Sequence, residues 1–198
     1  KIGEQMDLVT IITPIYNGEK YLERYFTQIE AIDYENLQII VINDGSKDKT
    51  SEIVKKYANV DSRIEFIDKR TNEGVSSARN DALKMARGKF CFFFDCDDTF
   101  ETQIVEKCVS KVKADTDTVC YNYASVRRDG NVSKHEFSYR KCVYKKEEIL
   151  EQILPNSFGT SIADLKRYLS GKCGMRQGKE LNGPWRICLL YTSPSPRD

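Results

Sequence analysis

Three aspartates and a cysteine, Asp95-Cys96-Asp97-Asp98, directly follow an apolar run that ends at Phe94. Carboxylates placed this close together repel one another unless a cation neutralises part of their charge. Aspartate oxygens are hard ligands that suit Mg²⁺ or Mn²⁺, and these ions also bind phosphate oxygens. The run therefore predicts a divalent metal site. The alternative, a solvated turn or a helix cap, is more typical of an isolated Asp-x-Asp.

Three further polar clusters follow apolar segments of the chain. They are Thr13-Pro14-Ile15-Tyr16-Asn17, Asn43-Asp44-Gly45-Ser46 and the segment from Asn72 to Asn80. In an open α/β sheet, ligands bind outside the carboxyl ends of the strands. If the preceding segments are parallel strands, all of these clusters meet the acidic run at one edge of the sheet.

The apolar pattern predicts the elements that position these clusters. Short β-branched runs, typical of strands buried on both faces, occupy Leu8–Thr13 and Leu37–Asn43, and the apolar runs Ile64–Asp68 and Phe90–Phe94 predict two further strands. Apolar stripes with helical spacing lie between and after them, within residues 21–32, 53–57, 78–86 and 104–112. Alternating strands and helices predict an α/β fold with a mostly parallel central sheet flanked by helices. Farther along, residues 118–127 and 132–139 suggest a hairpin around Asp129-Gly130, and residues 146–154 another helix.

Three side chains near the predicted strand ends each allow two interpretations. Asp44, beside Gly45, could accept a hydrogen bond from the imide of a nucleobase that the glycine lets approach closely, or it could cap the helix near Lys49. Tyr16 could lie flat against a base or seal the core. Arg79 could bind a diphosphate or form a structural ion pair.

Composition excludes several classes of protein. The chain has 198 residues, with 31 basic and 30 acidic side chains and a net charge of +1, which argues against nucleic acid as a partner. Seven cysteines without a Cys-x-x-Cys pair indicate free thiols and a reducing compartment, and the single histidine, His135, argues against zinc. No run approaches the roughly 20 apolar residues of a membrane helix. We therefore expect a cytoplasmic protein without a span in this chain, leaving peripheral association with the inner face of the membrane open.

The four polar clusters, in this order and spacing, resemble those of family 2 of the inverting glycosyltransferases, which have the GT-A fold. The likeness covers approximately residues 7–113. It implies that Thr13, Pro14 and Tyr16 line a nucleobase pocket and that Asp44 accepts a hydrogen bond from the base.

The same resemblance assigns roles beside the diphosphate. It implies that Arg79 lies near the nucleotide, that Asp95 contacts the ribose or the metal's hydration shell, and that Asp97 binds Mn²⁺ or Mg²⁺ directly. The implied activity is transfer of a sugar from a nucleotide-diphosphate sugar, a UDP-sugar above all, to a hydroxyl of a glycan, lipid-linked or other acceptor with inversion. Polysaccharide, cell-wall or glycolipid synthesis is the implied setting.

Two other functions are weighed against this one. A sugar-1-phosphate nucleotidyltransferase would call for a glycine-rich, basic signature near the first strand, which residues 13–18 lack. A non-catalytic domain that binds a nucleotide sugar or a partner protein is the second alternative.

The second half of the chain departs from the family pattern. Related enzymes place a catalytic carboxylate, often in a Glu-Asp pair, after a segment resembling residues 183–187, and here no such pair follows Asp98. Asp164 and Glu180 are later candidates, but neither has the expected context. We expect a chain truncated before its general base, organised as a lead-in (1–6), a nucleotide-sugar and metal half (7–113), a partial acceptor side (114–187) and a non-native or disordered tail (188–198).

Overall fold

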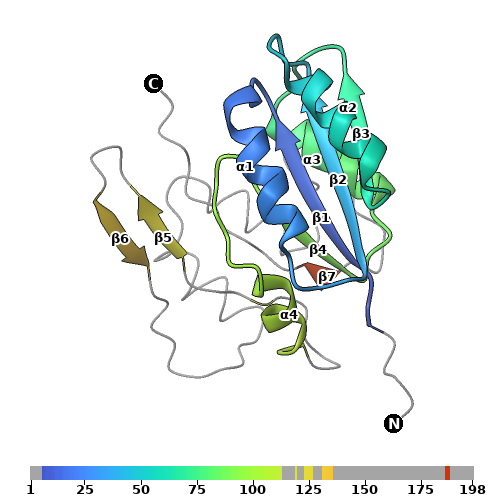
Figure 1. Cartoon of the computed structure of the whole chain (residues 1–198). Helices are drawn as coiled ribbons and strands as arrows, with labels where there is room; N and C mark the ends of the chain where they lie inside the picture. Colours follow the sequence, from blue (N-terminus) through green and yellow to red (C-terminus); the bar gives the residue numbers. More distant parts are fainter. Residues whose placement is uncertain (1–5, 113–118, 120–122, 127–130, 136–185, 188–198) are drawn as a thin grey trace. The chain divides into compact units, whose positions relative to one another are not determined.

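The computed structural model of the chain describes residues 6–112, 119, 123–126, 131–135 and 186–187. The chain divides into two compact units (Figure 1). Residues Lys1–Tyr121 together with Pro184–Asp198 form the first unit, and residues Asn122–Gly183 form the second. The four strands expected in the first half of the chain all belong to the first unit.

A parallel sheet forms the centre of the first unit, with the strand order β3-β2-β1-β4-β7. Every neighbouring pair in this sheet is parallel. The strands are β1 (Val9–Ile15), β2 (Leu37–Asp44), β3 (Ile64–Lys69), β4 (Phe90–Phe93) and β7 (Arg186–Ile187). The predicted α/β fold with a parallel central sheet is therefore confirmed.

Helices cover both faces of this sheet (Figure 1). They are α1 (Glu19–Glu30), α2 (Thr50–Val60), α3 (Val75–Met85) and α4 (Ile104–Val109). Successive strand residues point to opposite faces, so Ile11 packs in the core with α1 and α2, whereas Ile12 packs in the core with α3. The chain thus forms three layers, with α1 and α2 on one face of the sheet and α3 on the other.

The burial of the strands follows their place in the sheet. Every residue of β1 and β2 is buried, as the continuous apolar runs predicted. In β3 only Ile64 is buried, because β3 is the outermost strand at its end of the sheet and has a neighbour on one side only. The apolar stripe predicted to end the first helix at Ile32 also overruns α1, since Ile32 lies beyond the helix but still packs in the same core.

The strand order creates a topological switch point between β1 and β4. From β1 the chain moves outward through β2 and β3, then returns to β4 on the other side of β1. The carboxyl ends of β1 and β4 lie side by side at this point, and we call this place, where ligands bind in open α/β sheets, the crevice. The Tyr16 loop and the acidic run both stand at this crevice.

In the second unit, β5 (Tyr123–Val126) and β6 (Val132–His135) pair antiparallel, which confirms the predicted hairpin pairing. The expected turn at Asp129-Gly130 and the expected helix at residues 146–154 lie outside the described residues. Within the described part of the chain, no helix combines the length and the apolar character needed to cross a membrane.

Candidate functional site at the carboxyl edge of the sheet

The acidic run begins two residues after β4 and forms a turn. The backbone N–H of Asp98 donates to the carbonyl oxygen of Asp95 at 3.1 Å. Asp95, Asp97 and Asp98 are half-buried, while Cys96 between them is buried in the core. Burial, followed by the negative charges of Asp97 and Asp95, raises the pKa of the Cys96 thiol to about 12. The thiol therefore stays protonated and anchors the run.

The loop after β1 packs directly against this run. A Cβ atom added to Gly18 would lie 3.2 Å from the Cys96 sulfur and 2.5 Å from the Ile15 side chain. The absence of a side chain at Gly18 thus lets the two loops approach each other. The convergence of the first and fourth polar clusters at one edge, expected from the sequence, is present in the structure.

Arg79 and Asp95 form an ion pair at this edge. Arg79 Nη2 donates to Asp95 Oδ1 at 2.7 Å, and the Arg79 guanidinium lies 5.7 Å from the centre of the Phe93 ring. The structural ion pair left open as the alternative for Arg79 therefore exists. Arg79 Nε is buried and has no hydrogen-bond partner among the described residues, so the guanidinium keeps a donor to offer.

The Asp97 side chain differs from the Asp95 side chain, which pairs with Arg79, in its contacts. Within the described residues, its carboxylate makes no ion pair or hydrogen bond, and no group of three or more His, Cys, Asp and Glu side chains is placed to hold a metal ion. Mg²⁺ does not require such a cage, because it is usually held by one or two carboxylates, substrate phosphates and water. The donor set at Asp97 and Asp95 fits a metal bound in that way.

Asp44 is buried at the end of β2, and its carboxylate holds the loop that leads into α3. Its Oδ1 accepts from the backbone N–H of Glu73 at 3.1 Å and pairs with Lys69 Nζ at 3.2 Å. Its Oδ2 accepts from the backbone N–H of Gly74 at 2.8 Å. The alternative role as a cap of the Lys49 helix is wrong. With three partners and about four lone-pair sites, the carboxylate can accept one further hydrogen bond.

Lys69 is a residue of this edge that the sequence analysis missed. Its side chain is only 11% exposed and also pairs with Glu73 at 2.7 Å and Asp81 at 3.5 Å. Burial lowers the pKa of Lys69, but hydrogen bonds to Glu73 and Asp44 outweigh burial and raise it above the ordinary value. A lysine directly after the predicted strand Ile64–Asp68, at the edge where the other polar clusters lie, was the available signal.

The remaining predicted site residues lie at the end of β1 or directly after it and are buried to different degrees. Thr13 is fully buried, and its hydroxyl shares a 2.6 Å hydrogen bond with the Tyr25 hydroxyl. Pro14 is buried as well. Tyr16 is 50% exposed, so the interpretation that it seals the core is wrong. Among these three residues, only Tyr16 presents a side chain to solvent at the crevice.

Gly45 makes a close backbone contact that the sequence did not predict. Its φ of +72° favours glycine, and an added Cβ would lie 2.5 Å from the backbone carbonyl carbon of Thr71. The close approach that Gly45 permits is therefore to the loop before α3, whereas the sequence suggested an approach by a ligand.

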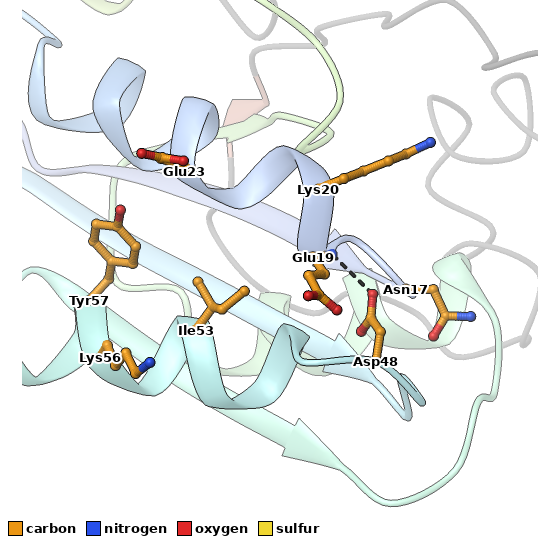
Figure 2. Close-up of a pocket in the computed structure, with 8 residues that line it drawn as sticks. All are labelled: Asn17, Glu19, Lys20, Glu23, Asp48, Ile53, Lys56 and Tyr57. Atoms are coloured by element: carbon orange, nitrogen blue, oxygen red, sulfur yellow. Dashed lines mark hydrogen bonds between the residues drawn. The ribbon is translucent and has the colours of Figure 1, made fainter.

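The turns after β1 and β2 are joined by reciprocal hydrogen bonds (Figure 2). Asp48 accepts from the backbone N–H groups of Thr50 and Glu19, both at 3.0 Å, and Glu19 accepts from the backbone N–H of Lys49 at 3.1 Å. Asp48 thereby satisfies donors at the starts of both α1 and α2. Burial raises the pKa of Asp48, but hydrogen bonds from the Thr50 hydroxyl and from these backbone groups lower it by more.

A depression also lies between α1 and α2, lined by side chains of both charges (Figure 2). Its lining residues are Asn17, Glu19, Lys20, Glu23, Asp48, Ile53, Lys56 and Tyr57. None of the predicted site residues lines it. The depression is a groove beside the crevice, and the chemistry predicted from the sequence lies elsewhere.

The parallel sheet with the order β3-β2-β1-β4, flanked by helices, is the sheet of the GT-A fold, which solved glycosyltransferases share. The solved mannosyltransferase from Pyrobaculum calidifontis, in complex with GDP-Man and Mn²⁺, has the same fold. It superposes with a TM-score of 0.56 at 22% identity, over 60% of this chain and 36% of that one.

The sequence comparisons give the family. The family model described as glycosyl transferase family 2 matches residues 10–167. The glycosyltransferase GlyA of Streptococcus pneumoniae is 36% identical over 74% of this chain and 22% of its own length. An uncharacterized glycosyltransferase of Haemophilus influenzae is 33% identical over 70% of this chain and 56% of its own length, and the chondroitin synthase of Escherichia coli is 27% identical over 78% and 22%.

The chain belongs to glycosyl transferase family 2. It spans between 22% and 56% of the length of these three relatives. The family assignment goes against a sugar-1-phosphate nucleotidyltransferase.

The two glycines with positive φ allow a matched test of this edge. Alanine strains the backbone at either position by about 1–3 kcal/mol. At Gly74, with φ +92°, the added Cβ meets nothing within 4 Å, whereas at Gly45 it meets the Thr71 backbone. We expect Gly74→Ala to lower the free energy of unfolding by about 1–3 kcal/mol and Gly45→Ala to lower it further. Urea titration of both variants measures this, and equal losses would contradict the proposed packing.

Removing the Asp48 carboxylate should destabilise the joined turns in a pH-dependent way. Leaving a hydrogen-bond donor without its partner costs about 1–3 kcal/mol, so Asp48→Ala should lower the free energy of unfolding by that amount at neutral pH. Because the folded-state pKa of Asp48 is depressed, its stabilisation is present above the ordinary aspartate pKa and is lost as the pH falls through the folded-state pKa.

Denaturant titration at about pH 7 and about pH 3 measures this difference between the wild type and Asp48→Ala. Glu23→Ala, which removes an exposed carboxylate on the neighbouring α1, is the control. A difference of the same size at both pH values would show that the ionised form of Asp48 contributes nothing.

Proposed function

We propose that this chain carries the donor half of an enzyme that transfers a sugar from a nucleotide-diphosphate sugar to an acceptor hydroxyl. The observation that carries the proposal is the half-buried Asp97 carboxylate, which has no hydrogen-bond or ion-pair partner among the described residues and follows the Arg79–Asp95 pair at the switch point. Membership of glycosyl transferase family 2 and relatives such as the chondroitin synthase support a role in polysaccharide, cell-wall or glycolipid synthesis.

Asp97 would hold Mn²⁺ or Mg²⁺ directly, and Asp95 would hold it through water or contact the ribose. The metal supplies positive charge that stabilises the departing diphosphate. Arg79 orients the Asp95 carboxylate and adds a second positive charge at the same edge. Its buried Nε, which lacks a partner in the described structure, could donate to a phosphate oxygen without breaking the pair with Asp95.

The nucleobase would be bound by the loops after β1 and β2. The half-exposed ring of Tyr16 offers a face for stacking. Asp44 has capacity for one more hydrogen bond, which suits a ring N–H between two carbonyl groups, as uracil has, and this is why we propose a UDP-sugar. Thr13 and Pro14 would line the pocket through their backbone, since both side chains are buried and the Thr13 hydroxyl is bonded to Tyr25.

In the proposed transfer, the acceptor oxygen forms a bond to the anomeric carbon on the face opposite the diphosphate. The bond between that carbon and the diphosphate oxygen breaks, and its electron pair leaves with the nucleoside diphosphate. This displacement inverts the anomeric centre, as the family resemblance implies. A carboxylate base would take the acceptor's proton. We assign that role to none of the described residues, because Asp44 and Asp95 already have cationic partners and Asp97 would bind the metal.

The acceptor would be a glycan, a lipid-linked sugar or another hydroxyl compound. We place the reaction in the cytoplasm, where nucleotide sugars are made, with peripheral association at the inner face of the membrane. The described cysteines Cys91 and Cys96 are buried free thiols, which is consistent with a reducing compartment.

Asp97→Ala tests the metal site. We expect the variant to lose the increase in UDP affinity that Mn²⁺ gives the wild type, because it removes the carboxylate that holds the ion. Titration calorimetry with UDP, with and without Mn²⁺, measures this. Glu52→Ala, which removes an exposed carboxylate on α2 that pairs only with Lys56, is the matched control. UDP binding that ignores Mn²⁺ in the wild type, or survives unchanged in Asp97→Ala, would reject the proposed function.

A donor panel then separates an active enzyme from a binding fragment. Sugar transfer, or slow hydrolysis of one nucleotide sugar, would support catalysis by this chain. Metal-dependent binding without either reaction would support the catalytically incomplete alternative.

Tyr16 provides a second test, directed at the base. Stacking of a base on an aromatic ring contributes about 1–3 kcal/mol as judged by alanine substitution, so Tyr16→Ala should weaken UDP binding by roughly 5- to 150-fold. Tyr16→Phe keeps the ring and should stay close to the wild type. Because Tyr16 is half-exposed, the melting temperature should change little in both variants. Equal UDP affinity of the alanine and phenylalanine variants would exclude stacking.

A further inference from the structure

Two side chains of α1 hold the main chain of the acidic run. Arg24 Nη2 donates to the carbonyl oxygen of Asp97 at 2.5 Å. Gln28 Nε2 donates to the carbonyl oxygen of Asp98 at 3.3 Å, and Gln28 Oε1 accepts from the backbone N–H of Phe100 at 3.1 Å. All three hydrogen bonds go to the backbone, so they fix the path of the run while leaving the Asp97 carboxylate available.

Arg24 and Gln28 lie outside the face of α1 that packs in the core. The buried face of α1 consists of Leu22, Tyr25, Phe26 and Ile29. Arg24 and Gln28 are four residues apart and therefore share another face of the helix. Arg24 is exposed and Gln28 is half-buried. Their hydrogen bonds thus add to the contacts that hold α1 on the sheet, and their direct effect is on the acidic run.

Two further contacts restrain the main chain of the run and of the residues that follow it. The Cys96 side chain is buried in the core, and the backbone N–H of Asp33, just beyond α1, donates to the carbonyl oxygen of Thr102 at 2.9 Å. Cys96 and Arg24 therefore restrain the main chain immediately before and at Asp97. A ligand whose main chain is already restrained loses little freedom when it binds an ion.

We propose that Arg24 and Gln28 are positioning residues that set the metal affinity of Asp97. The inference rests on the proposed function, since it requires Asp97 to bind Mn²⁺ or Mg²⁺. Groups that orient metal ligands typically change metal affinity by about 10- to 100-fold when they are removed. Arg24 also places a positive charge beside the run, whereas Gln28 is neutral, so Gln28 separates positioning from electrostatics.

Gln28→Met is the main test, because methionine has a similar length, suits a helix and removes both hydrogen bonds without a change of charge. We expect the Mn²⁺ concentration that gives half-maximal UDP binding to rise by about 10- to 100-fold. Binding of uridine, which lacks the diphosphate, should stay at the wild-type level. Titration calorimetry on the full chain measures both quantities, and thermal unfolding confirms that each variant is folded.

Thr27→Ala is the matched control. Thr27 is exposed on α1 next to Gln28, and its hydroxyl donates to the carbonyl oxygen of Glu23 within the helix. This variant should keep the Mn²⁺ dependence of the wild type. Arg24→Met offers a second variant at an exposed position should Gln28→Met fail to fold, and we expect the same rise in the Mn²⁺ requirement, with partial recovery in Arg24→Lys.

The outcomes separate the two proposals. If Asp97→Ala abolishes the effect of Mn²⁺ but the folded Gln28 or Arg24 variants need no more Mn²⁺ than Thr27→Ala, the positioning role is wrong and the proposed function stands. If uridine binding weakens as much as Mn²⁺-dependent binding, the effect is a general loss of structure and the positioning role is again rejected. If Asp97→Ala leaves the Mn²⁺ effect intact, the proposed function itself fails.

Discussion

Negative charge gathers at the carboxyl edge of the sheet, and the partners that neutralise it determine how the surrounding loops are arranged. Asp44 at the end of β2 is matched by Lys69 at the end of β3. Asp95 after β4 is matched by Arg79 from α3. An isolated buried charge is strongly unfavourable, so these pairs fix which side chains must meet. The Asp97 carboxylate has no such cationic partner among the described residues.

Hydrogen bonds also connect the turns after β1 and β2, where Tyr16, the residue proposed to stack on the base, lies. Asn17 follows Tyr16, and its backbone N–H donates to the Ser46 hydroxyl at 2.8 Å while its side-chain oxygen accepts from the Lys47 backbone at 2.8 Å. Together with the hydrogen bonds of Asp48, these contacts tie the turn after β1 to the turn after β2. Tyr16 therefore presents a half-exposed ring on a backbone held by hydrogen bonds, and a restrained backbone reduces the entropy lost when a ligand stacks on the ring.

Much of this arrangement could be predicted from the sequence because buried parallel strands have an unmistakable pattern. Continuous β-branched runs such as Ile39–Ile42 place the strands, and the polar residues after them then mark the carboxyl edge. The pattern does not predict which of these polar groups form hydrogen bonds within the fold. The hydroxyl of Thr13 is bonded to Tyr25, and two of the partners of Asp44 are backbone N–H groups.

Contacts to the backbone leave the least trace in a sequence. Arg24 and Gln28 read as ordinary solvent-facing residues of an amphipathic helix, because their partners are carbonyl and N–H groups that every residue has. Gly45 was recognised as a point of close approach, but the approaching group is the chain itself near Thr71. Helical periodicity identifies the face that packs on the sheet. It does not predict which exposed side chains contact a neighbouring loop.

Helices α1 and α3 hold the acidic run through different atoms, so the run is fixed in place while the Asp97 carboxylate stays available. Asp44 fixes the loop before α3. One turn into that helix, Arg79 pairs with Asp95, so α3 links the end of β2 to the acidic run. Helix α1 holds the run from its other side through main-chain atoms. With Asp95 oriented by a side chain and the backbone fixed by α1, the fold makes no structural use of the Asp97 carboxylate in the described contacts. A carboxylate retained where the fold does not need it is a local inconsistency of the kind expected at a functional site.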